Sequence, residues 1–305
     1  MINFSRKFFR PIYQKIHYLL HLTLHFNPFI RKKIHGRRIT IGHIRMEQET
    51  NPLLDSTIVK ELIKHCIDIA PYTIDAGKFN QYLLEVKYPS EYFNNGIVKS
   101  DSFIEKALEH FVSIELLQPN NAKTIIDIGA ANSPFYNIIR NHYDVNNSYA
   151  QDLIYLDELN NFLIGGNASK LPFESNSIDG ITLHCTLEHF EGTNDIGFFI
   201  EAERILKPGG VCIVLPLYLA SEYTINLDPI SNMLKCYRPN IKEDMHAQFR
   251  YGNSNQHFSR HYDVKTFKRR ILEQVNLKTE ILHVVNYKNI NSKSYLRFMG
   301  VFTKI

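Results

Sequence analysis

The amino-acid sequence predicts an α/β fold in which a mostly parallel β-sheet carries helices on both faces. Between about residue 96 and residue 218, short apolar runs alternate with segments of helical length. Strands separated in this way pair in parallel through crossover connections. The 305-residue chain is 44% hydrophobic and 22% charged, which supports a buried core. Such sheets bind ligands at the carboxyl ends of their strands, so the residues after each run are candidate site residues.

Residues 1–95 are interpreted as a basic, aromatic N-terminal extension. From Met1 to Met46 there are ten lysines and arginines but no aspartate or glutamate. Apolar residues at helical spacing predict a helix over Ile12–Phe26. Two interpretations stay open for this segment: it packs on the protein, or residues 1–38 make a peripheral contact with a membrane. No apolar run approaches the about twenty residues that span a bilayer, and no secretory signal is recognised.

The core begins with a predicted helix that starts at Ser102. Ser102 and Glu105 have the spacing of a capping box, with Ser102 as N-cap and Glu105 at N3. The apolar, β-branched run Lys123–Ile128 then predicts a buried parallel strand. Pro134 suits the first turn of the helix that follows. Four later runs are read as strands: Ser148–Asp152, Phe162–Gly165, Asp179–His184 and Val211–Leu215.

The remaining part of the chain completes a single domain over residues 96–305. A helix that carries Phe198 and Phe199 precedes the strand Val211–Leu215. Residues from about 219 to 262 are expected to form an insertion that covers the substrate. After a helix over Val264–Leu272, the runs Leu277–Asn286 and Tyr295–Lys304 are expected to complete the sheet as a hairpin-like edge.

Polar and glycine residues stand after three of the predicted strands. Gly129 follows the first strand, where a tight turn brings backbone close to a ligand and favours a residue without a Cβ. Asp152 ends the second strand, and a carboxylate there can accept hydrogen bonds from a ribose diol. Asn167 offers an amide to an adenine edge. Each has an ordinary alternative: a plain strand-to-helix turn, a solvated loop aspartate and a turn-forming asparagine.

Two histidines follow the fourth predicted strand. His184 and His189 lie in the sequence His-Cys-Thr-Leu-Glu-His-Phe, and either can act as a general base on a hydroxyl group. A purely structural role stays open for both. Together with Glu188 they match no closed zinc site, so no metal is expected. In the tail, Arg260, His261 and Tyr262 mix cationic, hydrogen-bonding and aromatic groups, so they are candidate acceptor-binding residues. The alternative that stays open is a surface loop that fixes the helix after it.

Composition narrows the classes of partner and compartment. The four cysteines are dispersed, which favours free thiols in a reducing, cytoplasmic compartment. A formal charge of +4 does not by itself indicate nucleic-acid binding. Nucleic acid is not expected as a partner, because no RNA-binding motif is present and the basic residues lie outside the core.

Four segments, in this order and at this spacing, resemble the class I S-adenosylmethionine-dependent methyltransferases, in particular the small-molecule branch called methyltransferase type 11. The resemblance covers Thr124 to about Tyr218, roughly a third of the chain. It departs from the family at Ala131 and Ser133, where further glycines are usual, and at Asn167, where aspartate is common. The matching residues are Ile125–Gly129, Asp152, Asn167–Phe173 with Asn176–Asp179 after it, and Glu201–Gly210.

The resemblance implies a Rossmann-like, mostly parallel seven-stranded sheet whose last strand is antiparallel. It also implies S-adenosyl-L-methionine as cofactor and methyl transfer to a small-molecule or glycan-type acceptor at oxygen. Asp127 and Gly129 would hold the methionine part, Asp152 the ribose, and Asn167 with Ala168 the adenine, while His184 would line the methyl-transfer cleft. The whole cofactor set is Asp127, Gly129, Ala130, Ser133, Asp152, Asn167, Ala168 and His184.

Two other functions are compatible with the same α/β fold. A nicotinamide-dependent oxidoreductase would need a G-x-G-x-x-G turn, which residues 129–134 lack. A non-catalytic scaffold would retain the fold and bind neither cofactor.

Overall fold

The computed structural model describes residues 39–42, 52–89, 93–94, 97–98, 101–131, 133–155, 162–228, 232, 237, 239–244, 246–252 and 257–305. The predicted helix Ile12–Phe26 and the proposed membrane-contacting residues 1–38 lie outside these ranges. No helix in the described ranges is long and apolar enough to cross a bilayer.

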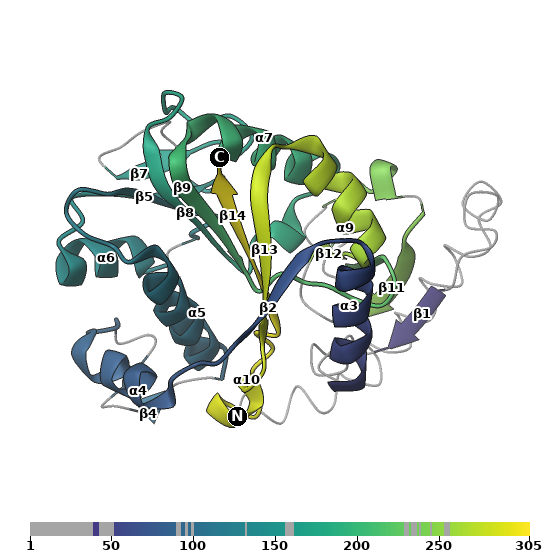
Figure 1. The fold of residues 1–305 in the computed structure, drawn as a ribbon, viewed down its shortest axis with the longest axis horizontal. Coiled ribbons are helices and arrows are strands. Elements are labelled where there is room, and N and C mark those ends of the chain that lie inside the picture. Colours follow the sequence, from purple (N-terminus) through teal and green to yellow (C-terminus); the bar gives the residue numbers. More distant parts are fainter. Residues whose placement is uncertain are drawn as a thin grey trace.

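The predicted α/β fold is confirmed by an eight-stranded sheet in the order β2-β13-β14-β9-β8-β5-β6-β7 (Figure 1). Its strands pair in parallel except for β14, which is antiparallel to both of its neighbours. The central strands form because their apolar runs are buried from both faces. The strands are β2 (Asp68–Tyr72), β5 (Thr124–Ile128), β6 (Asn147–Asp152), β7 (Leu163–Gly165), β8 (Ile178–His184), β9 (Leu206–Leu215), β13 (Leu277–Val284) and β14 (Phe298–Lys304).

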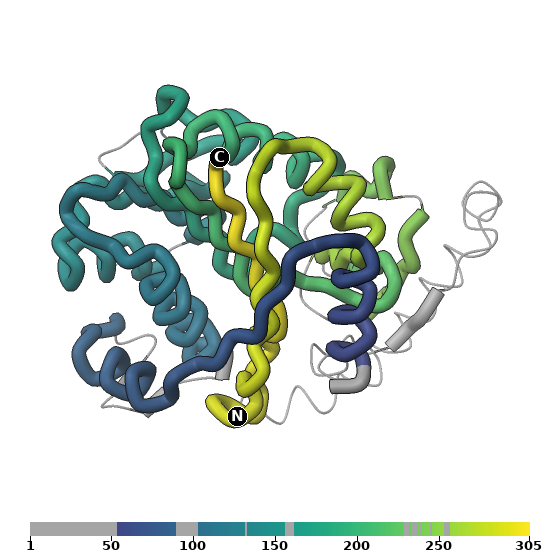
Figure 2. Tube along the Cα trace, viewed as in Figure 1, coloured from purple at the N-terminus to yellow at the C-terminus, as the bar shows by residue number. Residues whose placement is uncertain are grey.

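The sheet has one strand more than the seven that were predicted. The additional strand, β2, comes from the region interpreted as an N-terminal extension and pairs in parallel with β13. Figure 2 shows this early segment of the chain running beside the last strands. The hairpin-like pairing of β13 with β14 is confirmed. Neither strand forms the edge, because β14 joins β9 and β2 covers β13.

Alternate residues of the strands point to opposite faces of the sheet and belong to two separate hydrophobic cores. Ile126 and Ile128 of β5 face one core, whereas Ile125 faces the other. Helices α3, α7 and α9 pack on the first core, and α4, α5 and α6 pack on the second, on opposite sides of the sheet in Figure 1. The helices are α3 (Pro52–Lys64), α4 (Ala76–Glu85), α5 (Asp101–Leu117), α6 (Phe135–Tyr143), α7 (Asn194–Ile205), α9 (Val264–Arg270) and the short α10 (Tyr287–Ile290).

The start of α5 differs from the predicted capping box. The helix begins at Asp101, so Ser102 lies inside its first turn instead of at the N-cap. Glu105 turns away from the helix start, and its Oε1 accepts a hydrogen bond from the backbone N–H of Tyr295 at 3.1 Å. The capping-box prediction was therefore wrong, because a long-range partner engages this carboxyl group.

A second, smaller sheet forms largely from the segment predicted as an insertion. Its strand order is β1-β11-β10-β12, with β12 antiparallel to β10. β12 lies against the 3-10 turn η2 (Leu187–His189), which follows β8. The insertion thus approaches the carboxyl end of β8. Its strands are β1 (Ile39–Gly42), β10 (Thr224–Leu227), β11 (Gln248–Gly252) and β12 (Ser259–His261), and the hairpin β3 (Phe93–Asn94) and β4 (Ile97–Val98) stands apart.

The remaining short turns connect these elements. Two 3-10 turns are η3 (Lys242–Asp244) and η4 (Leu272–Gln274). The first precedes β11 in the small sheet, and the second joins α9 to β13.

Candidate functional site

The loop after β5 forms a tight turn at the carboxyl edge of the sheet. Gly129 has a φ of +65°, which favours glycine, and a Cβ there would collide with the side chain of Thr186. The next two amides point to β6: the N–H of Ala130 donates to the carbonyl of Gln151 at 2.9 Å, and the N–H of Ala131 donates to Asp152 Oδ2 at 2.9 Å. The predicted residues Gly129, Ala130 and Asp152 therefore meet at one point.

Asp152 is held by two backbone amides at this edge. Besides the bond from Ala131, its Oδ1 accepts a hydrogen bond from the N–H of Ile154 at 3.1 Å. Each carboxylate oxygen has a second lone pair, so both oxygens can still accept a hydroxyl group. Leu153 and Ile154, directly after it, are 76% and 55% exposed. The carboxylate is therefore oriented in advance, with apolar surface beside it.

Asp127 and His184 form a buried chain of hydrogen bonds beneath the same edge. Asp127 Oδ1 accepts from the hydroxyl of Thr182 at 2.9 Å and lies 2.8 Å from His184 Nδ1. His184 Nε2 lies 2.9 Å from the hydroxyl of Ser113 on α5. Asp127 Oδ2 is buried and has no hydrogen-bond partner among the described residues.

This arrangement argues against His184 as a general base. Its side chain is buried, and both ring nitrogens are engaged by protein groups. The imidazole instead fixes Asp127 and ties the end of β8 to α5. A catalytic role for His184 stays a prediction, and its contacts in the structure favour a positioning role.

Ser133 and His110 connect the first loop to α5. The hydroxyl of Ser133 lies 3.3 Å from His110 Nε2, and His110 Nδ1 lies 3.0 Å from the hydroxyl of Tyr88. Burial lowers the pKa of His110 well below its usual value, and the neighbouring His184 lowers it further. A neutral ring therefore bridges Tyr88 and Ser133, so Ser133 supports the loop from behind.

The adenine-facing residues predicted after β7 are arranged differently. Asn167 Nδ2 donates to Asn194 Oδ1 at 3.1 Å, and Asn167 Oδ1 accepts from the N–H of Ser169 at 2.9 Å. The amide thus shapes its own turn, which is the alternative that was left open, and ties this turn to the first residue of α7. Ala168 beside it is buried.

A polar cluster that sequence reasoning missed lies where α5 meets the end of β8. Lys106 Nζ donates to Glu109 Oε2 and to the carbonyl of His184, each at 2.9 Å. The thiol of Cys185 donates to Glu109 Oε1 at 3.2 Å. Burial and the adjacent Glu109 raise the pKa of Cys185, so the thiol stays neutral. In the sequence, Lys106, Glu109 and Ser113 recur at helical spacing, so they could have been placed on one face of the helix. Polar residues at this spacing are usually interpreted as a solvent-facing stripe.

Glu188 and His189 form a carboxylate–imidazole pair on η2. Glu188 is buried, which raises its pKa, and its Oε1 lies 3.6 Å from His189 Nε2. His189 Nδ1 lies 2.7 Å from the carbonyl of Phe258, so Nδ1 carries the proton and Nε2 faces Glu188. The His189 side chain is 40% exposed. A buried carboxyl group thus lies close to an imidazole that reaches solvent.

The three residues predicted to bind the acceptor are buried. Arg260 is 0% exposed, and its guanidinium pairs with both oxygens of Asp244 at 3.0 Å and with Asp195 at 3.0 Å. Tyr262 donates its hydroxyl to Asp195 at 2.7 Å. His261 Nε2 lies 3.0 Å from the hydroxyl of Ser259. Arg260 therefore neutralises the protein's own carboxylates, an arrangement that disfavours the predicted role in binding an anionic acceptor.

The central part of the chain is similar to a known family. Residues 129–214 match the family described as "Methyltransferase domain", which confirms the predicted resemblance. No curated protein sequence matches the chain. In the described ranges, no group of three or more His, Cys, Asp or Glu side chains is arranged to hold a metal ion.

Three solved structures are similar at low identity. The 1,6-didemethyltoxoflavin-N1-methyltransferase of Burkholderia thailandensis, solved with 1,6-didemethyltoxoflavin and S-adenosylhomocysteine, is 13% identical over 77% of this chain and 92% of that chain, with a TM-score of 0.40. The PH0226 protein of Pyrococcus horikoshii OT3 is 17% identical over 72% and 96%, with a TM-score of 0.41. The geranyl diphosphate C-methyltransferase of Streptomyces coelicolor A3(2) is 9% identical over 84% and 99%, with a TM-score of 0.41.

Proposed function

We propose, from the methyltransferase domain that residues 129–214 match, that this chain transfers the methyl group of S-adenosyl-L-methionine to an oxygen atom of a small-molecule or glycan-type acceptor. The observation that carries the proposal is the edge formed by the first loop and Asp152. A carboxylate oriented by two backbone amides, beside a close-turning glycine, is suited to a ribose diol.

The residues at this edge fit the three parts of the cofactor. Asp152 would accept hydrogen bonds from the two ribose hydroxyls. The buried Asp127 Oδ2, which has no partner among the described residues, would be satisfied by the ammonium group of the methionine part. Leu153 and Ile154 offer exposed apolar surface to the adenine ring. Ala130, Ser133, Asn167 and Ala168 would shape the surrounding loops.

Glu188 and His189 supply the chemistry for an oxygen acceptor. When bound, the cofactor would supply an electrophilic methyl group on a positively charged sulfur, with a neutral thioether as the leaving group. Glu188 would take the hydroxyl proton, since burial raises its affinity for protons. His189 would pass that proton to water, because its ring is half exposed and faces Glu188. The prediction of His189 as a catalytic group is thus kept, with Glu188 added.

Titration calorimetry with S-adenosylhomocysteine and with NADH tests the class of function. We expect binding of S-adenosylhomocysteine and none of NADH. Binding of NADH alone would indicate the oxidoreductase, and binding of neither would indicate the scaffold.

Single-turnover kinetics tests the proton acceptor, once a screen of hydroxylated acceptors with labelled cofactor has found a substrate. Glu188→Gln should slow methyl transfer about 100-fold or more while leaving the affinity for S-adenosylhomocysteine unchanged. His189→Gln should have a smaller effect that added imidazole partly reverses. Unchanged transfer rates in both variants would remove the pair from the reaction.

A further inference from the structure

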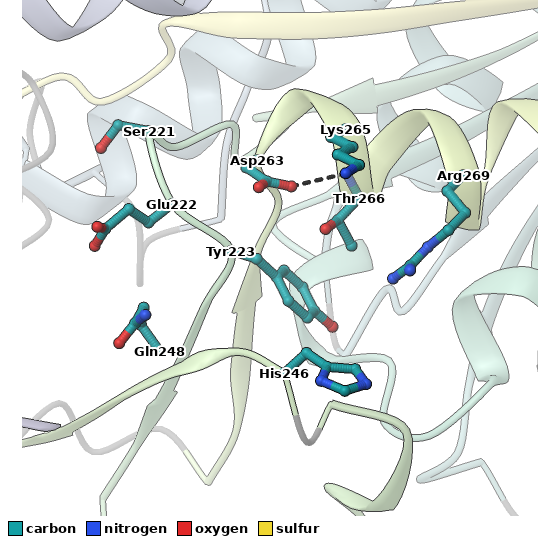
Figure 3. A pocket seen from close by; sticks show the side chains of 9 residues that line it. All are labelled: Ser221, Glu222, Tyr223, His246, Gln248, Asp263, Lys265, Thr266 and Arg269. Atoms are coloured by element: carbon teal, nitrogen blue, oxygen red, sulfur yellow. Dashed lines mark hydrogen bonds between the residues drawn. The ribbon is translucent and has the colours of Figure 1, made fainter. Parts of the chain in front are cut away.

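A polar recess of about 330 Å³ lies between α9 and the start of the small sheet, away from the residues assigned to methyl transfer (Figure 3). Helix α9 contributes Lys265 and Arg269, and the opposite wall contributes Glu222, His246 and Gln248. None of these residues belongs to the edge formed by β5, β6 and β8. The recess therefore needs an explanation of its own.

Cationic groups gather on one side of this recess. Lys265 and Arg269 lie four residues apart on α9, so their side chains project from the same face of the helix. Figure 3 shows Arg269 extending from the helix towards the hydroxyl of Tyr223 and the ring of His246. In the described part of the chain, neither Lys265 nor Arg269 forms an ion pair with a carboxylate. Among the described residues, these two cations thus border the recess without an ion-pair partner, while the carboxylates of Asp263 and Glu222 line other parts of it.

Two other residues that line the recess, Asp263 and Tyr223, already form hydrogen bonds within the protein. Asp263 Oδ1 accepts a hydrogen bond from the N–H of Thr266 at 2.7 Å, which caps α9. Tyr223 donates its hydroxyl to Asp244, a buried residue that also pairs with Arg260. Tyr223 therefore offers a ring surface to the recess while its hydroxyl is committed to the buried ion pair.

Hydrogen-bonding groups line the other side of the recess. Ser221, Glu222 and Gln248 lie opposite α9 in Figure 3. Glu222 is an acceptor of hydroxyl protons, whereas Ser221 and Gln248 can donate and accept. An inorganic anion would satisfy only the side with the cations. A ligand with an anionic group at one end and hydroxyl groups at the other would satisfy both sides.

We propose that this recess binds a small hydroxylated anion, such as a sugar that carries a phosphate or a carboxylate group. The anionic group would lie between Lys265 and Arg269, with His246 near it. The hydroxyl groups would face Glu222 and Gln248, and the sugar ring would lie against Tyr223. Arg260 cannot take this role, because its charge is neutralised inside the protein.

Calorimetry on the full chain with four probes tests this site: glucose 6-phosphate, glucuronate, inorganic phosphate and uncharged glucose. We expect at least one of the two sugar anions to bind with a Kd below about 1 mM, inorganic phosphate to bind more weakly, and glucose not to bind. The stronger of the two sugar anions identifies whether phosphate or carboxylate is preferred. Absence of binding by both sugar anions up to about 10 mM, or equal binding of glucose, would overturn the proposal.

Variants then locate the binding on α9. The double variant Lys265→Gln/Arg269→Gln should weaken sugar-anion binding about tenfold or more for each cation removed. Both residues are exposed and glutamine is a good helix former, so the fold should be retained. The matched control is Lys60→Gln/Lys278→Gln, which removes the same charge from exposed positions elsewhere. Equal weakening in the control would indicate a general charge effect and would overturn the proposal.

The same variants separate this site from the proposed methyltransferase function. Lys265→Gln/Arg269→Gln should bind S-adenosylhomocysteine as the unchanged protein does, because no residue is shared between the two sites. If the unchanged protein does not bind S-adenosylhomocysteine, the methyltransferase proposal alone is refuted. If it does not bind either sugar anion, the proposal for this recess alone is refuted.

Discussion

Replacing Asp152 with asparagine tests the cofactor site with a nearly isosteric change. Both carboxylate oxygens of Asp152 accept hydrogen bonds from backbone N–H groups, of Ala131 at 2.9 Å and of Ile154 at 3.1 Å. In the variant one oxygen becomes an NH2 group, which must then face one of these donors. The negative charge is lost, and so is one acceptor for a ribose hydroxyl.

The size of the effect follows from the bonds that Asp152→Asn removes. A hydrogen bond to a charged group contributes about 1.5–3 kcal/mol, and each 1.4 kcal/mol is a factor of ten in affinity. Loss of one ribose bond should therefore raise the Kd for S-adenosylhomocysteine about 10- to 150-fold. The lost backbone bond should also lower the free energy of unfolding by about 1 kcal/mol.

The assay is titration calorimetry at fixed salt, with urea unfolding to measure stability. Asp144→Asn is the matched control. Asp144 is exposed at the end of α6 with a φ of 56°, a conformation that asparagine also tolerates. Asp144→Asn should leave the Kd unchanged. If Asp152→Asn is folded and binds within about threefold of the unchanged protein, then Asp152 does not hold the ribose.

Two further predictions concern stability. Gly129→Ala should lower the free energy of unfolding by about 1–3 kcal/mol, because the new Cβ collides with Thr186 at a φ of +65°. Urea unfolding measures this loss, and adding Thr186→Ala should recover part of it. Strictly additive losses in the two variants would refute this contact. Burial and the nearby Glu109 raise the pKa of Glu105 to about 8 from 4.5. The contribution of Glu105 to the free energy of unfolding is therefore complete below pH 4.5 and declines as the pH rises towards 8. The cause is that the unfolded chain releases a proton in this range, whereas the folded chain retains it. Glu105→Gln should remove this decline, worth up to about 4 kcal/mol between pH 5 and pH 8, whereas the exposed control Glu280→Gln should retain it.

The central strands were predictable because their signal is local. The run from Thr124 to Ile128 is apolar and β-branched, and both faces of a parallel strand are buried, so sequence and structure agree there. β2 was missed for the opposite reason. It has five residues, Pro71 lies within it, and its only neighbour in the sheet is β13, more than two hundred residues away. Nothing local in Asp68–Tyr72 indicates that partner.

The residues of the candidate site were also predictable only in part. Gly129 and Asp152 stand at the ends of two predicted strands, and the structure brings these strand ends together as the spacing predicts. Arg260 looked like a free cation because its partners, Asp195 and Asp244, come from distant segments. His184 looked available because the sequence does not reveal that α5 covers it with Ser113. Partners of buried charges are set by tertiary packing, which no residue spacing records.

The pairing of β2 with β13 has a consequence for expressing the domain alone. A chain cut at residue 96, where the sequence places the domain boundary, would lack Asp68–Tyr72. The backbone amides and carbonyls of β13 that now bond to β2, over the five residues Glu280–Val284, would then stand unprotected. Unprotected strands of this kind pair with other chains. The shortened protein should therefore self-associate and precipitate, and β2 is the segment that prevents this in the longer chain.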